Sequence, residues 1–175
     1  MNEYQSEGTE SPTLSKNWRL YGQVASILLV ILLLVTILLP EGENPQLRIA
    51  GVFILALAAL YMFLPFYFLS KYGQGPEGES YMQSRQVVDR GPYAIVRHPQ
   101  YLGYALLACG FALLKQHWAI ILLAVPGVIF LYLQAVEEEK ICLSKFGEAY
   151  RRYCQRVPRF NFILGLVRVL SFSKS

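Results

Sequence analysis

Two short blocks in the second half of the chain combine ionisable and aromatic side chains at spacings that could bind a ligand. The first, over 91–103, contains Gly-Pro-Tyr and then Arg-His-Pro-Gln-Tyr-Leu-Gly. The second, over 137–159, contains Glu-Glu-Glu and Phe-Gly-Glu-Ala-Tyr and ends in Val-Pro-Arg. Strongly apolar segments separate the blocks. Ionisable groups at the ends of such segments are costly to retain and usually mark a functional site, so we look for function here.

The acidic run of Glu137, Glu138 and Glu139 is the strongest single signal. Three consecutive carboxylates repel one another, and the C-terminal end of a helix disfavours negative charge. On a helix, Glu138 and Glu139 project about 100° apart, so they could contact two parts of one ligand. A cationic or amine-bearing ligand would relieve the repulsion. The alternative is a solvated charge cluster at the membrane edge.

Arg97, His98 and Tyr101 form the polar part of the first block. A guanidinium such as that of Arg97 binds carboxylates and phosphates, and His98 and Tyr101 beside it suggest a ligand site. Two alternatives remain open. His98 could cap the following helix or bond a lipid headgroup, and Arg97 could serve only as a positive anchor at the membrane face.

The elements that must position these blocks are apolar helices. Only 16% of the 175 residues are charged, against about 25% in typical soluble domains. Four stretches carry no charge: 20–39, 49–70, 99–114 and 118–136. A helix that spans a membrane needs about 17–25 residues, so three stretches qualify and 99–114 is marginal. The sequence therefore predicts an all-α integral membrane bundle of about four transmembrane helices, with a cytoplasmic C-terminal helical segment.

The distribution of charge predicts the orientation of this bundle. If all four segments cross, fourteen of the 16 Lys and Arg residues lie on one side, and only Arg48 and Lys115 lie on the other. The positive-inside rule places the richer side in the cytoplasm, together with both termini and the active site. Contact with anionic membrane lipids accounts for the net charge of +4, and we expect no nucleic-acid partner.

The chain divides into three parts. Residues 1–17 are predicted to form a mobile tail, 18–70 two transmembrane helices, and 71–175 the catalytic region. Within this region we expect a cofactor loop, a helical hairpin, a C-terminal helix and an interfacial tail. Apolar residues at helical spacing from Phe146 to Val157 predict that the last membrane helix continues unbroken to Pro158.

The three cysteines are expected to be chemically inert. Cys109 lies within a predicted membrane helix, and Cys142 and Cys154 lie on the predicted cytoplasmic side, where disulfides are rare. No spacing of Cys and His suggests a zinc site, and we predict no metal ligand.

At the two blocks the chain resembles the isoprenylcysteine carboxyl methyltransferase family and, more broadly, the phospholipid methyltransferase-like superfamily. Gly-Pro-Tyr, Arg-His-Pro-x-Tyr-x-Gly, Glu-Glu, Phe-Gly-x-x-Tyr-x-x-Tyr and Val-Pro-Arg occur over 91–159 in the order and spacing of that family. The resemblance implies a membrane enzyme that uses S-adenosyl-L-methionine without a Rossmann domain. It also implies a lipophilic methyl acceptor that enters from the bilayer, either an isoprenylcysteine-like carboxylate or a phospholipid amine.

The resemblance also implies roles for individual residues. Cofactor contacts are expected from Tyr93, His98, Tyr101, Glu138 and Glu139. Catalytic roles are expected for Arg97, Glu138 and Glu139, and substrate contacts for Arg151 and Arg159.

Two other functions remain as alternatives. The C-terminal parts of NADPH-dependent sterol and steroid reductases show a similar pattern, including Arg-His-Pro-x-Tyr-x-Gly. Those reductases usually place an acid after the glycine, whereas here Tyr104 follows Gly103, and the Glu-Glu pair favours the methyltransferase. A non-catalytic membrane scaffold would explain the apolar helices but not the ordered polar motifs.

Overall fold

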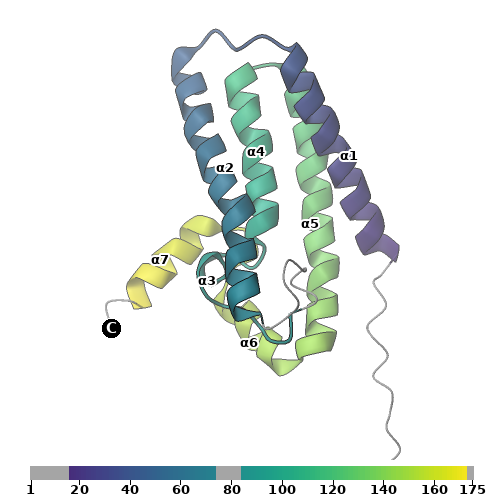
Figure 1. Cartoon of the computed structure of the whole chain (residues 1–175), viewed down its shortest axis with the longest axis vertical. Coiled ribbons are helices and arrows are strands. Elements are labelled where there is room, and N and C mark those ends of the chain that lie inside the picture. Colours follow the sequence, from purple (N-terminus) through teal and green to yellow (C-terminus); the bar gives the residue numbers. More distant parts are fainter. Residues whose placement is uncertain (1–15, 74–83, 173–175) are drawn as a thin grey trace, which may run out of the picture.

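The computed structural model describes residues 16–73 and 84–172, which form helices and no strands. The helices are α1 (Lys16–Leu38), α2 (Pro45–Tyr72), α3 (Pro92–Ile95), α4 (Pro99–Lys115), α5 (Trp118–Phe146), α6 (Glu148–Arg156) and α7 (Phe162–Phe172). The all-α prediction is therefore confirmed (Figure 1). The predicted N-terminal tail falls outside the described residues except at Lys16 and Asn17, which belong to α1. Most of the glycine-rich part of the predicted cofactor loop, at 74–83, also lies outside them.

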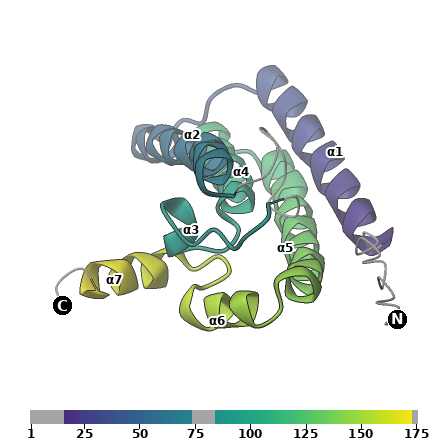
Figure 2. The same cartoon turned by 60° about the horizontal axis from the view of Figure 1, so that its bottom comes forward.

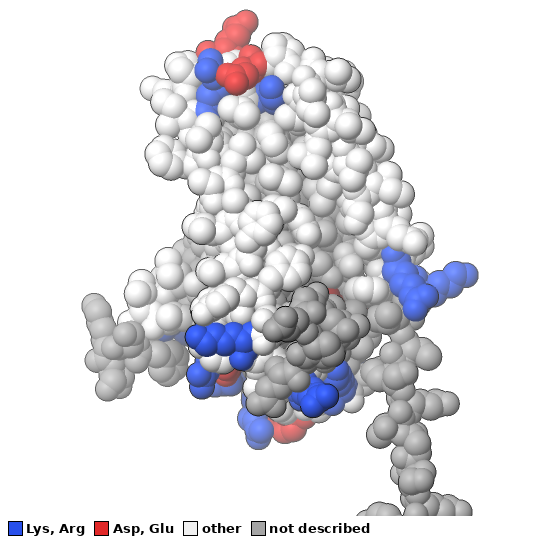
Figure 3. Space-filling model, in the orientation of Figure 1, with Lys and Arg blue, Asp and Glu red and all other residues white. Residues whose placement is uncertain are grey.

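Four long helices form the bundle, and successive helices run in opposite directions (Figure 1). α2 packs along α4, α1 packs along α5, and α4 and α5 lie against each other. α1 and α2 are therefore on opposite sides of the α4–α5 pair (Figures 1 and 2). Because the direction alternates, Lys and Arg side chains gather mainly at one end of the bundle, and a band without charge separates them from a small charged patch at the other end (Figure 3).

Three of these helices are long and apolar enough to cross a membrane: α1, α2 and α5. Their outward faces carry large apolar side chains, such as the exposed Phe53 and Leu122. α4 has 17 residues, which at 1.5 Å per residue span about 25 Å, less than the roughly 30 Å hydrocarbon core. The architecture is that of a multi-pass membrane bundle, with α4 as its short member.

Gly103 explains how closely α4 approaches α2. A Cβ atom at Gly103 would lie 2.9 Å from the backbone nitrogen of Met62 and 2.8 Å from its Cγ. Small residues at such crossings let membrane helices pack backbone to backbone. The glycine that ends the Arg-His-Pro-x-Tyr-x-Gly motif therefore sets the position of α4, and with it the position of the residues at the start of α4.

The prediction of one unbroken helix from the acidic run to Pro158 is wrong. α5 ends at Phe146, and α6 begins after Gly147, whose φ of 54° is readily adopted only by glycine. The chain turns at this residue, yet the predicted apolar stripe stays together. Tyr150, Tyr153 and Val157 are buried in one cluster, against which Phe146 packs.

The predicted tail helix is present as α7, which packs against α3. Gly165 lies against the carbonyl group of Ile95, and Arg168 Nη2 donates a hydrogen bond to the Ala94 carbonyl at 2.6 Å. The remaining surface of α7 exposes Ile163, Val167 and other apolar side chains. α7 projects to one side of the bundle (Figure 2).

Candidate functional site

The two sequence blocks meet where α4 begins and α5 approaches its end. The backbone nitrogen of Arg97 donates to the Pro158 carbonyl at 3.0 Å, and that of His98 donates to the Arg159 carbonyl at 3.4 Å. These two bonds join the end of the second block to the middle of the first. The side chains of both blocks then gather around two buried carboxylates on α5, Glu138 and Glu139.

Two arginines and a histidine surround the carboxylate of Glu139. Arg159 donates from Nε to Oε1 at 2.9 Å and from Nη2 to Oε2 at 2.6 Å. His98 Nε2 lies 3.2 Å from Oε1, and Arg97 Nη1 lies 3.4 Å from the same oxygen. Both carboxylate oxygens are therefore engaged by the protein itself. This two-point contact with Arg159 is the strongest geometry available to an arginine and a carboxylate.

Arg159 fixes the segment after α6 to the membrane helix. Its hydrogen bonds with Glu139 raise the pKa of the guanidinium, which is thus firmly charged. Its Nη1 also donates to the hydroxyl of Tyr132 at 2.8 Å. The ring of the next residue, Phe160, lies 6.0 Å from the ring of Tyr132 and 5.8 Å from that of His98. The Val-Pro-Arg end of the second block therefore closes over the start of α4.

Glu138 has a different environment from its neighbour. It is only 7% exposed, and its Oε2 accepts a hydrogen bond from the Tyr101 hydroxyl at 2.6 Å. Its Oε1 makes no hydrogen bond with any residue of 16–73 or 84–172. Burial, followed by the negative charge of Glu138, raises the pKa of Tyr93 on α3. Among the described residues, one carboxylate oxygen of Glu138 thus lacks a partner, and two tyrosines lie beside this carboxylate.

His98 does not cap α4, although it occupies the N-cap position. Its side chain makes no capping hydrogen bond, and the structure thereby rules out the simplest alternative for this residue. The ring instead stacks parallel to that of Tyr101 at 5.5 Å between centroids. His98 and Tyr101 together link the two carboxylates, since His98 contacts Glu139 and Tyr101 donates a hydrogen bond to Glu138.

Arg97 contributes a buried donor that lacks an acceptor. Its side chain is 12% exposed, and its Nε has no hydrogen-bond partner among the described residues. A buried, unsatisfied donor on a charged group is costly. An anionic ligand group would satisfy this atom.

The profile of the phospholipid methyltransferase family matches residues 46–149. This stretch is more than half of the chain and includes α3, α4, α5, His98, Tyr101 and both buried carboxylates. The chain belongs to the phospholipid methyltransferase family. α1 and the segment that contains Arg159 lie outside the matched residues.

Two curated relatives of this family member are sterol reductases. The chain is 32% identical over 80 residues to the Delta(14)-sterol reductase TM7SF2 of Mus musculus, a match that covers 42% of this chain and 18% of that protein. It is 34% identical over 83 residues to the Delta(14)-sterol reductase LBR of Gallus gallus, over 44% of this chain and 12% of that protein. The chain therefore spans less than a fifth of either relative.

The structure brings together most, but not all, of the site residues that the sequence predicts. Arg151 lies on the exposed face of α6, where it pairs with Glu148 at 3.6 Å, away from the carboxylates. The third acid, Glu137, pairs with Lys140 at 2.5 Å. The remaining predicted residues are in contact with one another or interact through their charges. They are Tyr93, Arg97, His98, Tyr101, Glu138, Glu139 and Arg159.

Sequence reasoning missed Tyr132 and Phe160, which complete the aromatic side of the site. Tyr132 precedes Glu139 by seven residues, which is two helical turns, so both lie on one face of α5. That spacing could have drawn attention to Tyr132. Phe160 has no such local signal, because only the turn after α6 brings it to α4.

Proposed function

We propose that this protein is a membrane-embedded methyltransferase that uses S-adenosyl-L-methionine and acts on a lipophilic acceptor. The observation that carries the proposal is that the residues matched to the family contain a buried carboxylate, Glu138, one oxygen of which has no partner among the described residues. The acceptor is an isoprenylcysteine-like carboxylate or a phospholipid amine.

The donor groups of the site fit such a cofactor. The free Oε1 of Glu138 suits the cofactor's amino group or ribose hydroxyls, and the unsatisfied Nε of Arg97 suits its carboxylate. Tyr93, His98 and Tyr101 supply ring surfaces beside them, and aromatic faces attract positively charged groups. Glu139 is already neutralised by Arg159, so we assign it to the shape and charge balance of the site.

S-adenosyl-L-methionine, when bound, supplies a methyl group whose bond to sulfur breaks as the bond to the acceptor forms, with the electron pair left on sulfur. The residues of this chain then orient both partners and exclude water, which favours such a transfer. A carboxylate acceptor needs no base. An amine acceptor must lose a proton, which Glu138 or His98 would take up.

The environment of the site supports a lipophilic acceptor. An apolar hollow of about 290 Å³ lies between α2 and α3, lined by residues that include Leu60, Tyr61, Pro92 and Ile95. It adjoins the Gly-Pro-Tyr segment and the lipid-facing side of α2. We propose that the acceptor enters here from the bilayer and that the basic end of the bundle, with the site and both termini, faces the cytoplasm.

A second candidate function is an NADPH-dependent sterol reductase-like activity, because the curated relatives at 32–34% identity are sterol reductases. A non-catalytic scaffold is the third. Thermal unfolding of the full chain in detergent, with S-adenosylhomocysteine or NADPH, distinguishes them. We expect S-adenosylhomocysteine at 100 times its Kd to stabilise the protein by about 2.7 kcal/mol, and NADPH to have no effect.

Glu138→Gln is the informative variant in this assay, and Glu148→Gln on the exposed face of α6 is its matched control. The first should lose the response to S-adenosylhomocysteine, whereas the second should keep it. A response to NADPH alone would favour the reductase, and no response to either ligand would favour the scaffold. Transfer of a radiolabelled methyl group to a panel of prenylcysteines and phospholipids then identifies the acceptor.

A further inference from the structure

The outer face of α7 carries four exposed apolar side chains, which we call the α7 stripe. Ile163, Leu166, Val167 and Leu170 recur at intervals of three, one and three residues, so they lie on one face of the helix. Their exposed fractions are 43–63%. Gly165 is two positions from both Ile163 and Val167 and therefore lies on the opposite face. Single exposed apolar residues are ordinary, but a contiguous stripe of them indicates an interaction surface.

The opposite face of α7 is fixed to the protein. A Cβ atom at Gly165 would lie 1.9 Å from the carbonyl oxygen of Ile95, so α7 lies directly on the backbone of α3. Arg168 donates to the Ala94 carbonyl at 2.6 Å and also to the carbonyl of Arg156, at the end of α6. The α7 stripe is therefore directed away from α3.

The α7 stripe continues the lipid-facing surface of the bundle. α7 projects sideways from the bundle, close to the end at which Lys and Arg gather (Figures 1 and 2). In Figure 3 the uncharged surface of the bundle continues onto α7, with basic side chains below it. Ile95, on which α7 lies, also lines the apolar hollow against α2. A helix with an apolar face at this level of a membrane bundle suits the interfacial layer of the bilayer.

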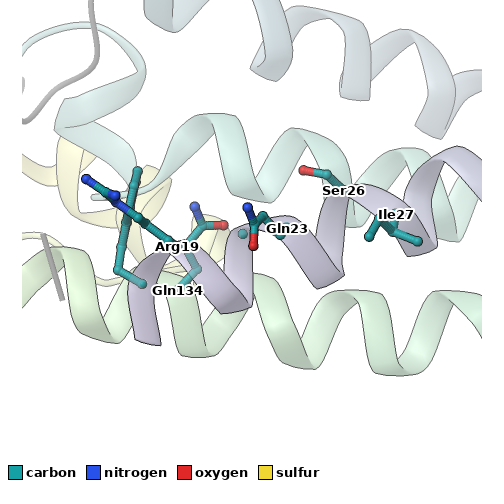
Figure 4. A pocket seen from close by; sticks show the side chains of 7 residues that line it. Arg19, Gln23, Ser26, Ile27 and Gln134 are labelled. Atoms are coloured by element: carbon teal, nitrogen blue, oxygen red, sulfur yellow. The ribbon is translucent and has the colours of Figure 1, made fainter. Parts of the chain in front are cut away.

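The composition of α1 at the same end of the bundle is different. Its exposed residues Arg19, Gln23 and Ser26 line an open hollow against α5 (Figure 4). Polar side chains of this kind suit contact with water and lipid headgroups. The α7 stripe contains no polar side chain. Its apolar surface is thus a property of α7 and not of this end of the protein in general.

α3 connects α7 to the candidate site. It has four residues, and an isolated helix of this length is not stable in water. Its Tyr93 is 5% exposed, accepts a hydrogen bond from the Tyr153 hydroxyl at 2.8 Å through its carbonyl, and interacts with the charge of Glu138. Gly165 and Arg168 of α7 hold the other end of α3. A movement of α7 would therefore be transmitted to the Gly-Pro-Tyr segment.

We propose that α7 is an in-plane membrane anchor. The α7 stripe lies in the interfacial layer of the bilayer at the basic end of the bundle, and the opposite face of the helix braces α3 at the candidate site. Basic side chains at this end reinforce the contact through anionic lipid headgroups. α7 lies outside the residues matched to the family, and the anchor is independent of the proposed methyl transfer.

Quenching of tryptophan fluorescence by lipid measures whether the α7 stripe enters the bilayer. The two tryptophans of the chain are Trp18 and Trp118. The full-length Trp18→Phe/Trp118→Phe variant receives one new reporter, either Ile163→Trp on the α7 stripe or Glu148→Trp, its control on the exposed face of α6. Each protein is placed in phosphatidylcholine nanodiscs whose acyl chains do or do not carry bromine. Trp18→Phe alone, which retains the exposed Trp118 at the start of α5, is the positive control.

We expect brominated lipid to quench Ile163→Trp about as strongly as it quenches Trp118, and aqueous iodide to quench it weakly. Glu148→Trp should show the reverse. Bromine near the headgroup end of the acyl chains should quench Ile163→Trp more than bromine near the chain ends, because an interfacial helix is buried by only about 5–10 Å.

Leu170→Glu and Ser171→Glu form a matched pair. Both add the same charge to an exposed residue in the last turn of α7, but only Leu170 belongs to the α7 stripe. Leu170→Glu should reduce the lipid quenching of Ile163→Trp. In nanodiscs it should also speed hydrogen exchange of the Ala94 and Val96 amides, which bond within the turn of α3, by about tenfold. Ser171→Glu should change neither measurement.

Iodide quenching of Ile163→Trp equal to that of Glu148→Trp, without quenching by lipid, would overturn the bilayer contact. Protection from both quenchers together with a dimer in light scattering would overturn the anchor and assign the α7 stripe to a second copy of the chain. Unchanged exchange in Leu170→Glu would overturn the bracing of α3 by the membrane. The quenching of Ile163→Trp does not depend on whether Leu170→Glu folds, and neither measurement requires methyl transfer.

Discussion

Replacing Glu139 with Gln should destabilise the protein strongly, because it removes the carboxylate that Arg97, His98 and Arg159 share. The change leaves Arg159 without its charged partner at 2.6 and 2.9 Å, and Arg97 and His98 without theirs at 3.4 and 3.2 Å. Breaking a buried ion pair by removing one partner costs about 3–5 kcal/mol. The Arg159 side chain is 26% exposed, so water compensates part of the loss and we expect the lower end, about 3 kcal/mol.

The assay is thermal unfolding of the full chain in detergent, without ligand. For a chain of this length, 1 kcal/mol shifts Tm by about 2–4 °C, so Glu139→Gln should lower Tm by about 6–12 °C. Glu138→Gln is the matched control, because Glu138 is equally buried but bonds one neutral donor, Tyr101. A glutamine can still accept that bond, and we expect a loss of about 1 kcal/mol.

A double-mutant cycle with Arg159→Gln isolates the ion pair. If the pair is responsible, the two single losses should not add, because the second substitution removes an interaction already broken. Equal Tm values for Glu139→Gln and Glu138→Gln would refute this reasoning. The sequence motif also predicts that Glu139→Gln weakens cofactor binding, and a titration with S-adenosylhomocysteine below the lowered Tm tests that role separately from stability.

Two further predictions concern packing and thiol reactivity. Gly103→Leu should lower the free energy of unfolding by about 1–3 kcal/mol, because no side chain fits between α4 and α2 at this position. The control Gly127→Ala should be neutral, because the atom nearest to the added Cβ would be 3.8 Å away. Similar Tm values for the two variants would contradict this prediction. Burial raises the pKa of Cys154, and alkylation requires the thiolate. The alkylation rate of Cys154 should therefore rise only at pH values above the pKa of an ordinary cysteine. A rate midpoint near the ordinary value of about 8.5 would show that the thiol is not shielded.

The sequence by itself determined the helices and the membership of most of the site. Uncharged stretches at 20–39, 49–70 and 118–136 predicted α1, α2 and α5, because an apolar run of this length is stable as a helix in a membrane. The ordered motifs likewise identified His98 and the two buried carboxylates, since ionisable groups at such helix ends are retained only where they have partners.

Only the tertiary structure decided which partner each group has. Glu139 is held by Arg159 twenty residues further along the chain, whereas its neighbour Glu138 bonds Tyr101. No local pattern distinguishes two adjacent glutamates. Their environments differ because Gly147 turns the chain back over the site, and because Gly103 sets how far α4 approaches α2. The pairing of α1 with α5 has the same origin, because α2 and α4 separate these two helices in sequence and only the fold brings them side by side.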